Sequence, residues 1–427
     1  MGLIANSGQL SLTPQREVVI KLIEAGLESI QPKKILRESF SVHGFSLTVK
    51  DREFNLKDYN RVFLIGFGKG SGGISKIIEK DLGEFLTGGY VIDNVEQKFS
   101  KINFTKGTHP LPSQENINFT VNALSNIKNL SEKDLVLVVI CGGGSAMFED
   151  PYKVDLKTLI KISNLLLKSG ATISEMNVIR KHLSKVKGGG LAKHLYPATV
   201  ASLIFSDVPG SDLSTIASGP TFKDLSTTEQ AFEIIEKYGI SKNLDINKDW
   251  FTNLPNEEKY FKNVYNLIIV ENKTALLAMR QKAKSLGFET DLYSDRLQGD
   301  AKFIGKFLIE KAKKGRILLA GGETTLKVRG GGRGGRNQTV VLASLPFIDK
   351  NTVIASFDSD GVDFYYFAGA IGDKKTLEKS DKLKLDQREY LSNDNSYGFF
   401  EKVGDGILTG KLESNVSDLM LVFKSDV

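Results

Sequence analysis

Residues 62–73 read Val-Phe-Leu-Ile-Gly-Phe-Gly-Lys-Gly-Ser-Gly-Gly. The apolar run at 62–65 predicts a short strand, and residues 74–82 after the glycines read as a helix. A strand that turns on glycines into a helix is the repeating unit of an α/β sheet. Other apolar runs are equally short, rich in Val, Ile and Leu, and show little alternation. This pattern is typical of strands buried on both faces of a parallel sheet.

The rest of the chain repeats this alternation of strands and helices. Amphipathic stretches predict helices at 15–27, 116–130, 156–167, 174–187 and 274–286. The alternation therefore indicates an α/β fold with right-handed crossovers. The further predicted strands are Tyr90–Ile92, Leu135–Ile140, Val200–Phe205, Leu267–Val270, Ile317–Ala320, Val353–Ala355 and Leu419–Phe423.

Length and composition favour a globular protein of two or three domains. A polar stretch at 241–258 places a boundary near residue 260, which gives an N-terminal domain at 1–260 and a C-terminal domain at 261–427. The charge-rich segment 373–387 is expected to be an exposed excursion inside the second domain. With 41% apolar and 25% charged residues, disorder is excluded as the main state.

Several functional classes are disfavoured by simple features of the sequence. The formal charge of +6 is mild and does not demand nucleic acid, although it suits a small anionic ligand. A single cysteine, Cys141, excludes an intramolecular disulfide and a zinc site built from cysteines. No apolar run approaches the roughly 18–20 residues of a membrane span, and the first residues lack a signal-peptide pattern. A cytoplasmic protein is expected.

Two glycine-rich turns after strands are candidate anion sites. The first contains Gly68, Lys69 and Ser71 at the predicted start of a helix, where backbone N–H groups attract anions. It departs from the dinucleotide fingerprint at Ser71 and from the P-loop at Gly70, so a flexible turn with a solvated lysine is the alternative.

The second turn reads Cys-Gly-Gly-Gly-Ser-Ala at 141–146. Gly143, Gly144 and Ser145 are expected to cradle phosphate groups, because consecutive glycines allow a ligand to approach the backbone closely. The alternative is a simple turn in which the serine caps a helix. Cys141 is expected to be packed and inert.

Charged residues elsewhere complete the candidate site. Arg180 and Lys187 share one face of the predicted helix at 174–187, although cations near a helix C-terminus are favoured by the dipole in any case. Asp207 follows a buried strand and could hold Mg²⁺ or orient a hydroxyl, or merely begin a turn. Glu323 and Asp360 are weaker candidates for metal ligands.

The segment 321–338 is the most distinctive of the chain, since five glycines interleave with Arg333 and Arg336. Guanidinium groups on a pliable backbone suit phosphate or carboxylate, and Asn337 lies beside them. An RNA-binding tract is disfavoured, because the segment is short and lacks aromatic residues.

Together these motifs resemble the glycerate 2-kinase family, whose C-terminal part is the MOFRL domain. The resemblance runs from about residue 15 to the end of the chain. It rests on the motifs Gly68-Lys69, Gly107-Thr108-His109-Pro110, Gly142 to Ala146, Asn177 to Gly189, Ser206 to Gly210, Ile216 to Pro220, Gly321 to Gln338, Asp358 to Asp363 and Asn415 to Leu419.

The resemblance implies a larger Rossmann-like parallel-sheet domain and a smaller α/β MOFRL domain, with the active site in the cleft between them. It implies phosphorylation of the 2-hydroxyl of D-glycerate, with ATP and Mg²⁺, to give 2-phosphoglycerate and ADP. In similar proteins the residues that match Lys69 and Arg336 line the active site. The implied partners are these small molecules, with neither nucleic acid nor membrane, in a monomer or homodimer.

One departure and two alternatives remain at this stage. Residues 364–367 read Phe-Tyr-Tyr-Phe where the family usually has small residues, so the pocket near that loop is expected to be reshaped. The first alternative is an NAD(P)-dependent hydroxypyruvate reductase, a name that relatives have carried. The second is a nucleotide or metabolite sensor without catalytic activity.

Overall fold

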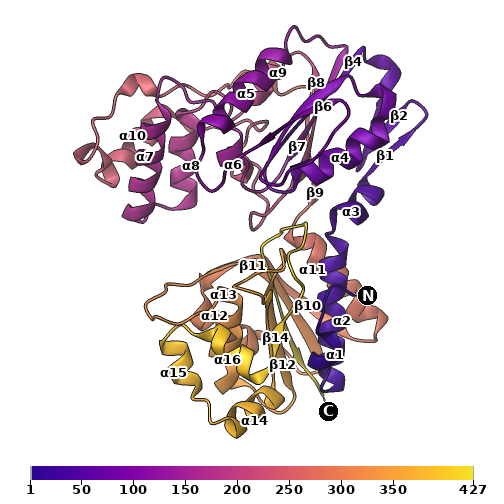
Figure 1. Ribbon diagram of the computed structural model, residues 1–427, viewed down its shortest axis with the longest axis vertical. Helices are drawn as coiled ribbons and strands as arrows, with labels where there is room; N and C mark the ends of the chain where they lie inside the picture. Colours follow the sequence, from indigo (N-terminus) through magenta and orange to yellow (C-terminus); the bar gives the residue numbers. More distant parts are fainter. Residues whose placement is uncertain (1, 427) are drawn as a thin grey trace. The chain divides into compact units, whose positions relative to one another are not determined.

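The computed structural model describes residues 2–426 and divides the chain into two compact units (Figure 1). Unit 1 comprises Met1–Ile35, Asp207–Gly210 and Val270–Val427. Unit 2 comprises Leu36–Ser206 and Ser211–Ile269. All eight strands predicted from the apolar runs are present.

Unit 2 is built on a six-stranded sheet of order β6-β5-β4-β7-β8-β9. Its ladders from β6 through β8 are parallel, as predicted. Every residue of β7 is buried, which explains why its sequence shows no alternation. The strands are β4 (Arg61–Phe67), β5 (Gly88–Asp93), β6 (Ile102–Lys106), β7 (Asp134–Ile140), β8 (Thr199–Phe205) and β9 (Val264–Val270).

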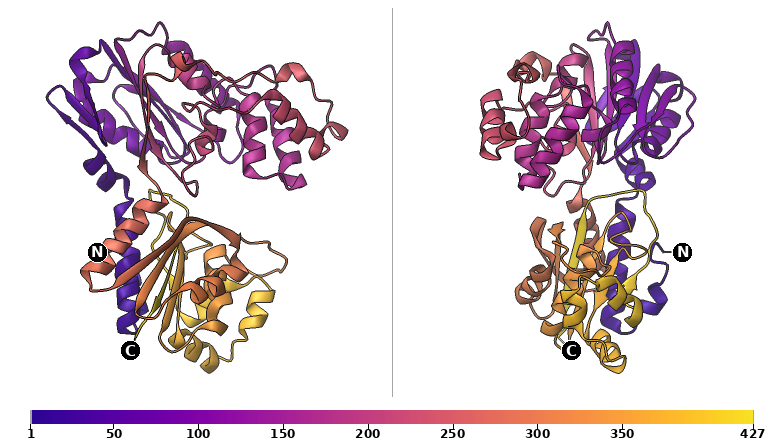
Figure 2. Two further views of the ribbon diagram at one scale, coloured as in Figure 1. Left: turned by 180° about the vertical axis from the view of Figure 1, so that it is seen from behind. Right: turned by 60° about the vertical axis from the view of Figure 1, so that its left-hand side comes forward.

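Three helices of unit 2 gather to one side of this sheet around their own apolar cluster (Figures 1 and 2). They are α7 (Leu156–Ser169), α8 (Ile173–His182) and α10 (Thr228–Lys237). The unit also contains α3 (Pro32–Ser39), whose last residues belong to it, and α4 (Ser71–Leu82), α5 (Gln114–Asn126), α6 (Gly144–Met147) and α9 (Gly190–Leu195). A small antiparallel sheet contains β1 (Phe40–His43), β2 (Ser46–Val49) and β3 (Arg52–Asn55).

The helix predicted at 174–187 is shorter than expected, because α8 ends at His182. The chain then turns back beside the segment after α6. Ser184 forms a β-bridge with Pro151, and the backbone N–H of Lys185 donates to the carbonyl of Asp150 at 2.8 Å. Lys187 therefore does not continue the helical face of Arg180.

The sheet of unit 1 is mixed, in contrast to the parallel sheet that the buried strands suggested throughout. Its order is β10-β11-β15-β12-β13-β14; the pair β10–β11 is parallel, and the other four neighbouring pairs are antiparallel. The last strand enters between β11 and β12 in the opposite direction to both. The strands are β10 (Glu289–Asp300), β11 (Arg316–Thr325), β12 (Thr352–Asp358), β13 (Gly369–Gly372), β14 (Gly406–Ile407) and β15 (Asp418–Lys424).

Helices cover both faces of this second sheet (Figures 1 and 2). On one face lie α2 (Pro14–Ser29) and α11 (Asn272–Ser285), which approach closely at Gly26, where a Cβ would lie 2.9 Å from Cγ of Met279. The other face carries α12 (Ala301–Lys311), α13 (Arg336–Ser344) and α16 (Ser396–Val403) over a buried apolar cluster. The remaining α-helices of this unit are α1 (Ser7–Leu10), α14 (Lys374–Lys382) and α15 (Gln387–Ser392).

The N-terminal residues belong to unit 1, so the units differ from the expected ranges 1–260 and 261–427. A buried ion cluster accounts for the difference. The fully buried Arg16 of α2 donates from Nε to Asp373 at 2.8 Å and from Nη1 to Asp405 at 2.9 Å. The segment from residue 373 is consequently not a wholly exposed excursion, because its first carboxylate is buried against α2.

No helix within residues 2–426 has both the length and the apolar character needed to cross a bilayer.

Replacing Arg16 tests the ion cluster. We expect Arg16→Met to lower the free energy of unfolding by about 3–5 kcal/mol, because two buried carboxylates lose their shared cation. Urea denaturation measures this change. Arg37→Met removes an exposed arginine and serves as the control, with an expected change within about 0.5 kcal/mol. Equal effects of both substitutions would contradict the role of Arg16.

Candidate functional site

The two glycine-rich turns of unit 2 lie side by side at the carboxyl ends of β4 and β7. The backbone N–H of Lys69 donates to the carbonyl of Gly142 at 2.8 Å, so the β ladder continues into both turns. Gly68 has φ +103°, and a Cβ there would lie 2.4 Å from the carbonyl oxygen of Cys141. Only glycine fits this position. Cys141 is buried, as predicted.

The N-terminus of α4 is occupied by a carboxylate of the protein itself. Asp93, at the end of β5, accepts the backbone N–H of Gly72 at 2.9 Å, and burial raises its pKa while these backbone hydrogen bonds oppose the shift. Ser71 is fully buried and donates to the carbonyl of Ile92 at 3.0 Å. The placement thus gives Ser71 a structural role in place of the expected phosphate contact. The carboxylate of Asp93 takes the N–H of Gly72, one of the donors that a dinucleotide pyrophosphate would use at such a helix end.

The second turn presents a ring of polar groups. The hydroxyls of Ser145 and Ser218 lie 2.9 Å apart, and that of Ser218 donates to Oδ1 of Asn177 at 3.2 Å. Gly143 has φ +79°, and a Cβ there would lie 2.8 Å from the ring of His109. Burial, followed by the charge of Lys69, lowers the pKa of His109.

Arg180 is the unusual cation of this region. It is half-buried on α8, one turn beyond Asn177 and on the same helix face. Its guanidinium forms no hydrogen bond or ion pair with any residue between 2 and 426, and burial lowers its pKa although Glu149 opposes the shift. An arginine withdrawn from water without a partner is costly, so the site is suited to an anion.

Lys187, in contrast to Arg180, has a charged partner. It is buried in an ion pair with Glu149, whose other oxygen accepts the hydroxyl of Ser184 at 2.6 Å. Burial lowers the pKa of Lys187, while Glu149 raises it. This pair joins the segment after α6 to the turn after α8, so Lys187 is structural, contrary to the expectation of a phosphate contact.

In unit 1, Arg336 opens α13 and is surrounded by acids. Its Nε donates to Asp418 at 2.8 Å, Nη2 donates to Asp358 at 3.1 Å, and Nη1 lies 3.6 Å from Glu323. Nη1 is thus the end of the guanidinium that lies beyond hydrogen-bond distance of these three acids. Asp418 is fully buried, and it also accepts Nδ2 of Asn337 at 2.7 Å.

The acids of this cluster outnumber its cation. Burial, followed by the charges of Asp360 and Asp418, raises the pKa of Asp358 well above its usual value. Burial also raises the pKa of Glu323; Arg336 opposes this shift, whereas Asp418 and Asp207 add to it. No group of three His, Cys, Asp or Glu side chains in the described part of the chain could hold a metal ion.

The glycine-arginine loop is anchored, not pliable. Asp394 accepts the backbone N–H groups of Arg329 at 2.6 Å and Gly330 at 2.8 Å, together with Nζ of Lys302 at 2.6 Å. These donors lower the pKa of Asp394 to about 2, although burial opposes them. A Cβ at four of the five glycines would lie within 2.5 Å of neighbouring atoms: Gly330 and Gly332 meet Asn393, Gly334 meets Ser396 and Gly335 meets Asp363.

Two other candidate residues of this segment have different surroundings. Asn337 is buried within the protein, and Arg333 lies outside the cluster of acids around Arg336. Asn337 is fully buried, and its Oδ1 accepts the hydroxyl of Ser356 at 2.5 Å. Arg333 is half exposed, and its guanidinium lies over the rings of Tyr365 and Tyr397 at 5.4 and 5.2 Å. The structure therefore gives Arg333 and Arg336 different surroundings.

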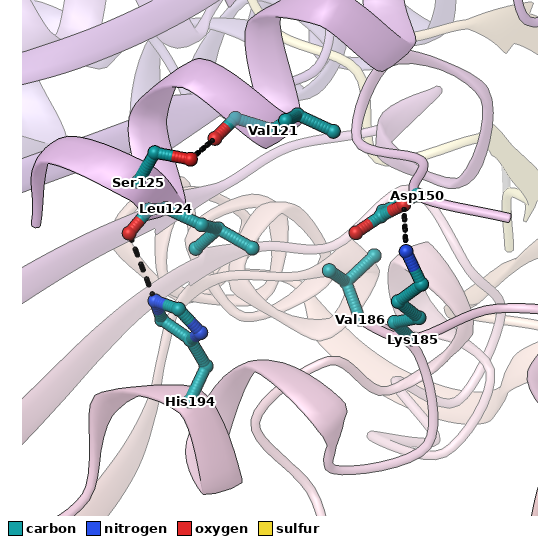
Figure 3. A pocket seen from close by; sticks show the side chains of 7 residues that line it. All are labelled: Val121, Leu124, Ser125, Asp150, Lys185, Val186 and His194. Carbon is teal, nitrogen blue, oxygen red and sulfur yellow. Dashed lines mark hydrogen bonds and ion pairs between the residues drawn. The ribbon is translucent and has the colours of Figure 1, made fainter. Parts of the chain in front are cut away.

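A separate cavity of about 230 Å³ lies on unit 2 beside α5 and α9 (Figure 3). Figure 3 shows Lys185 pointing toward Asp150, which it contacts at 2.9 Å, and His194 bonded to the carbonyl of Leu124. These polar groups already have partners, and none of the predicted site residues lines the cavity.

Comparison with known proteins identifies the family. A domain family of unknown function, DUF4147, matches residues 18–248, and the MOFRL family matches residues 316–418. A glycerate 2-kinase from Pyrococcus horikoshii is 35% identical, and the alignment covers 95% of this chain and 96% of that protein. The chain belongs to the glycerate 2-kinase family. It is therefore a kinase, as its motifs predicted.

Two further proteins are similar to this glycerate 2-kinase family member over nearly its whole length. The crystal structure of a glycerate kinase from Thermotoga maritima superposes with a TM-score of 0.83 at 30% identity, over 96% of this chain and 99% of the other. A protein of Agrobacterium vitis that carries hydroxypyruvate reductase as a provisional name is 32% identical, over 96% of this chain and 99% of that protein.

Several residues of the two clusters were not predicted from the sequence. Asp418 and Asp358 lie opposite one another at the ends of β15 and β12. Their positions at the ends of two predicted strands are the only sign in the sequence that they could lie close together. His109, Asn177 and Ser218 come from three separate segments, and only the fold brings them to the second turn.

A matched pair of glycines tests the turn geometry. We expect Gly68→Ala to abolish most activity, because its Cβ would collide with the Cys141 carbonyl at a φ that alanine avoids. Gly73→Ala lies in α4 with nothing within 4 Å, so it is expected to keep activity and gain up to about 1 kcal/mol of stability. Turnover and thermal melting of both variants measure this, and normal activity of Gly68→Ala would contradict it.

Proposed function

We propose that this kinase transfers a phosphoryl group from ATP to the 2-hydroxyl of D-glycerate in the presence of Mg²⁺, and so forms 2-phosphoglycerate and ADP. The family membership supports the substrate class. The charged groups of the two units support the chemistry, because phosphoryl transfer depends on positioning and charge neutralisation more than on covalent catalysis.

The unpaired guanidinium of Arg180 carries the proposal. Beside it the turn at 142–145 exposes backbone and hydroxyl groups, and Lys69 carries an ammonium without a partner among the described residues. We assign Arg180 and Lys69 to anionic groups of the reactants, with Gly143, Gly144 and Ser145 as backbone and hydroxyl contacts. Gly68 supports this arrangement by fixing the turn that carries Lys69.

The Arg336 cluster is assigned the complementary role. Nη1 of Arg336 would contact an anionic oxygen, while Asp418 and Asp358 hold the rest of the guanidinium in place. Mg²⁺ commonly binds one or two protein carboxylates together with phosphate oxygens and water. The excess negative charge around Arg336 suits such an ion, and one or two of the carboxylates of Glu323, Asp360 and Asp207 would contact it together with phosphate oxygens, since the described residues offer no cluster of three. When bound, the ion would neutralise phosphate charge; Asp207 is the alternative group to orient the hydroxyl.

The reaction itself is tested with purified protein. Incubation with D-glycerate, ATP and Mg²⁺ is expected to release ADP only when glycerate is present, and phosphorus NMR should show the 2-phosphate ester. A 3-phosphate product, or ADP release independent of glycerate, would contradict the proposal. Nicotinamide absorbance with hydroxypyruvate is the control for reductase activity and is expected to stay constant.

Arg180 gives a sharper test, because stability and activity should change in opposite directions. Arg180→Met removes a desolvated charge without a partner, so thermal stability should rise by about 0.5–2 kcal/mol, while kcat/KM should fall roughly 100-fold or more. The neighbouring Lys181 is the control, since it forms a buried ion pair with Asp224 at 2.5 Å. Lys181→Met should lose stability and keep its turnover. A loss of stability in Arg180→Met with normal turnover would assign Arg180 to the fold alone.

A further inference from the structure

A tight hairpin at 363–367 projects two tyrosines from unit 1. The backbone N–H of Asp363 donates to the carbonyl of Phe367 at 2.9 Å, and Phe364 and Phe367 exchange backbone hydrogen bonds of 3.3 Å in both directions. Tyr365 and Tyr366 form the tip, with exposed fractions of 54% and 70%. The rings that flank the tip are anchored, since Phe367 is buried and Phe364 packs on the apolar core.

The backbone of Tyr365, at the tip of the hairpin, adopts a conformation that tyrosine rarely takes. Tyr365 has φ +53°, a conformation in which glycine, asparagine or aspartate is the favoured residue and a bulky side chain is strained. An exposed ring that is kept in a strained conformation points to a use for the ring itself. The side chain of Tyr365 is 54% exposed, while its ring also contacts the rings of Phe364 and the buried Tyr397, with centroids 4.7 and 5.4 Å apart.

The tip is joined to a cation and to the Arg336 cluster. Arg333 lies over the rings of Tyr365 and Tyr397 at 5.4 and 5.2 Å, and it precedes Arg336 by three residues, at most about 10 Å of chain. Asp363, the first residue of the hairpin, accepts the backbone N–H groups of Asn337 and Gln338 at the start of α13. An aromatic platform and a phosphate- or metal-binding cluster are thus held on one scaffold.

We propose that Tyr365 and Tyr366, together with Arg333, form a stacking platform for the base of the nucleotide. Tyrosine rings and guanidinium planes stack on any planar base, and nucleotides combine such a base with the anionic groups assigned to the neighbouring cluster. The inference rests on the proposed function and deepens it. It names a binding surface that arises from the aromatic residues at 364–367.

Equilibrium binding to the full chain tests the platform, with ADP, adenosine and pyrophosphate as separate probes. Tyr366→Ala and Tyr365→Gly should each weaken ADP and adenosine roughly 5- to 100-fold and leave pyrophosphate within twofold. Tyr365→Gly relieves the strained φ but removes ring contacts with Phe364 and Tyr397, so its thermal melting is measured beside its binding. Tyr366→Ala, at a ring that is 70% exposed, provides the independent loss of binding. Tyr366→Phe keeps a ring and should bind normally. Tyr293→Ala, at an exposed tyrosine elsewhere in unit 1, is the matched control.

Kinetics provide the second measurement. For both platform variants the KM for ATP should rise by the same factor as the dissociation constant of ADP, with kcat and the KM for glycerate within twofold. Unchanged ADP affinity, an equal loss of pyrophosphate, or a change of oligomeric state in sedimentation would overturn the platform.

The two proposals fail separately. If the wild-type protein binds ADP through the tyrosines but does not phosphorylate glycerate, the proposed function falls and the platform stands. If glycerate is phosphorylated and the variants bind ADP normally, the platform falls alone.

Discussion

The buried carboxylate of Asp418 is the interaction on which the candidate site of unit 1 depends. It begins β15, the strand that pairs with both β11 and β12, and lies opposite Gly322 on one side and Asp358 on the other. From this position it accepts hydrogen bonds from Arg336, Asn337 and the backbone of Thr324. A charge buried so completely is tolerable only with such partners, so it fixes the start of α13 and the end of β11 together.

Arg336 and Arg180 are both withdrawn from water, but they differ in the number of acidic side chains that offset the cost of burying the charge. Arg336 is compensated by three acids, and its pKa is raised by them although burial opposes the shift. Arg180 has no hydrogen bond or ion pair within residues 2–426, and burial lowers its pKa although the charge of Glu149 opposes the shift. The first arrangement has more negative than positive charge, whereas the second suits an anion from outside the protein.

The sequence predicted the strands well because each is a short apolar run between glycine or polar residues, buried on both faces. The strands that it did not predict are β1, β2, β3, β6, β10, β13 and β14. For example, β10 has no fully buried residue, and its polar residues resemble a loop. Ser71, Lys187 and Asn337 were expected to contact a ligand, and the structure shows their side chains bonded within the protein: Ser71 to the carbonyl of Ile92, Lys187 to Glu149 and Asn337 to Asp418. The fold brings these partners near, and no local pattern shows them.

Glycines were the second source of error. A run such as that at 330–335 looks the same in sequence whether a ligand or the protein's own backbone approaches it. The structure places Asn393 to Ser396 against three of those glycines and Asp363 against a fourth, whereas at Gly68 the approaching group is the neighbouring turn. Lys69 was a candidate because it carries charge in a turn that follows a strand, where α/β folds place ligands. Arg180 was a candidate because it lies on a polar face of the predicted helix at 174–187, and both assignments stay predictions.

The ion cluster of Arg16 has a consequence for the order in which the chain is completed on the ribosome. Its partner Asp373 is synthesised 357 residues later, roughly 20–70 s at ordinary translation rates. Unit 2 is almost continuous in sequence, so all of it can be synthesised before the partners of α2 in unit 1 exist. During that interval the sheet of unit 1 does not yet exist, so the apolar face of α2 stays uncovered. Chaperones that recognise apolar segments can bind the nascent chain at this helix.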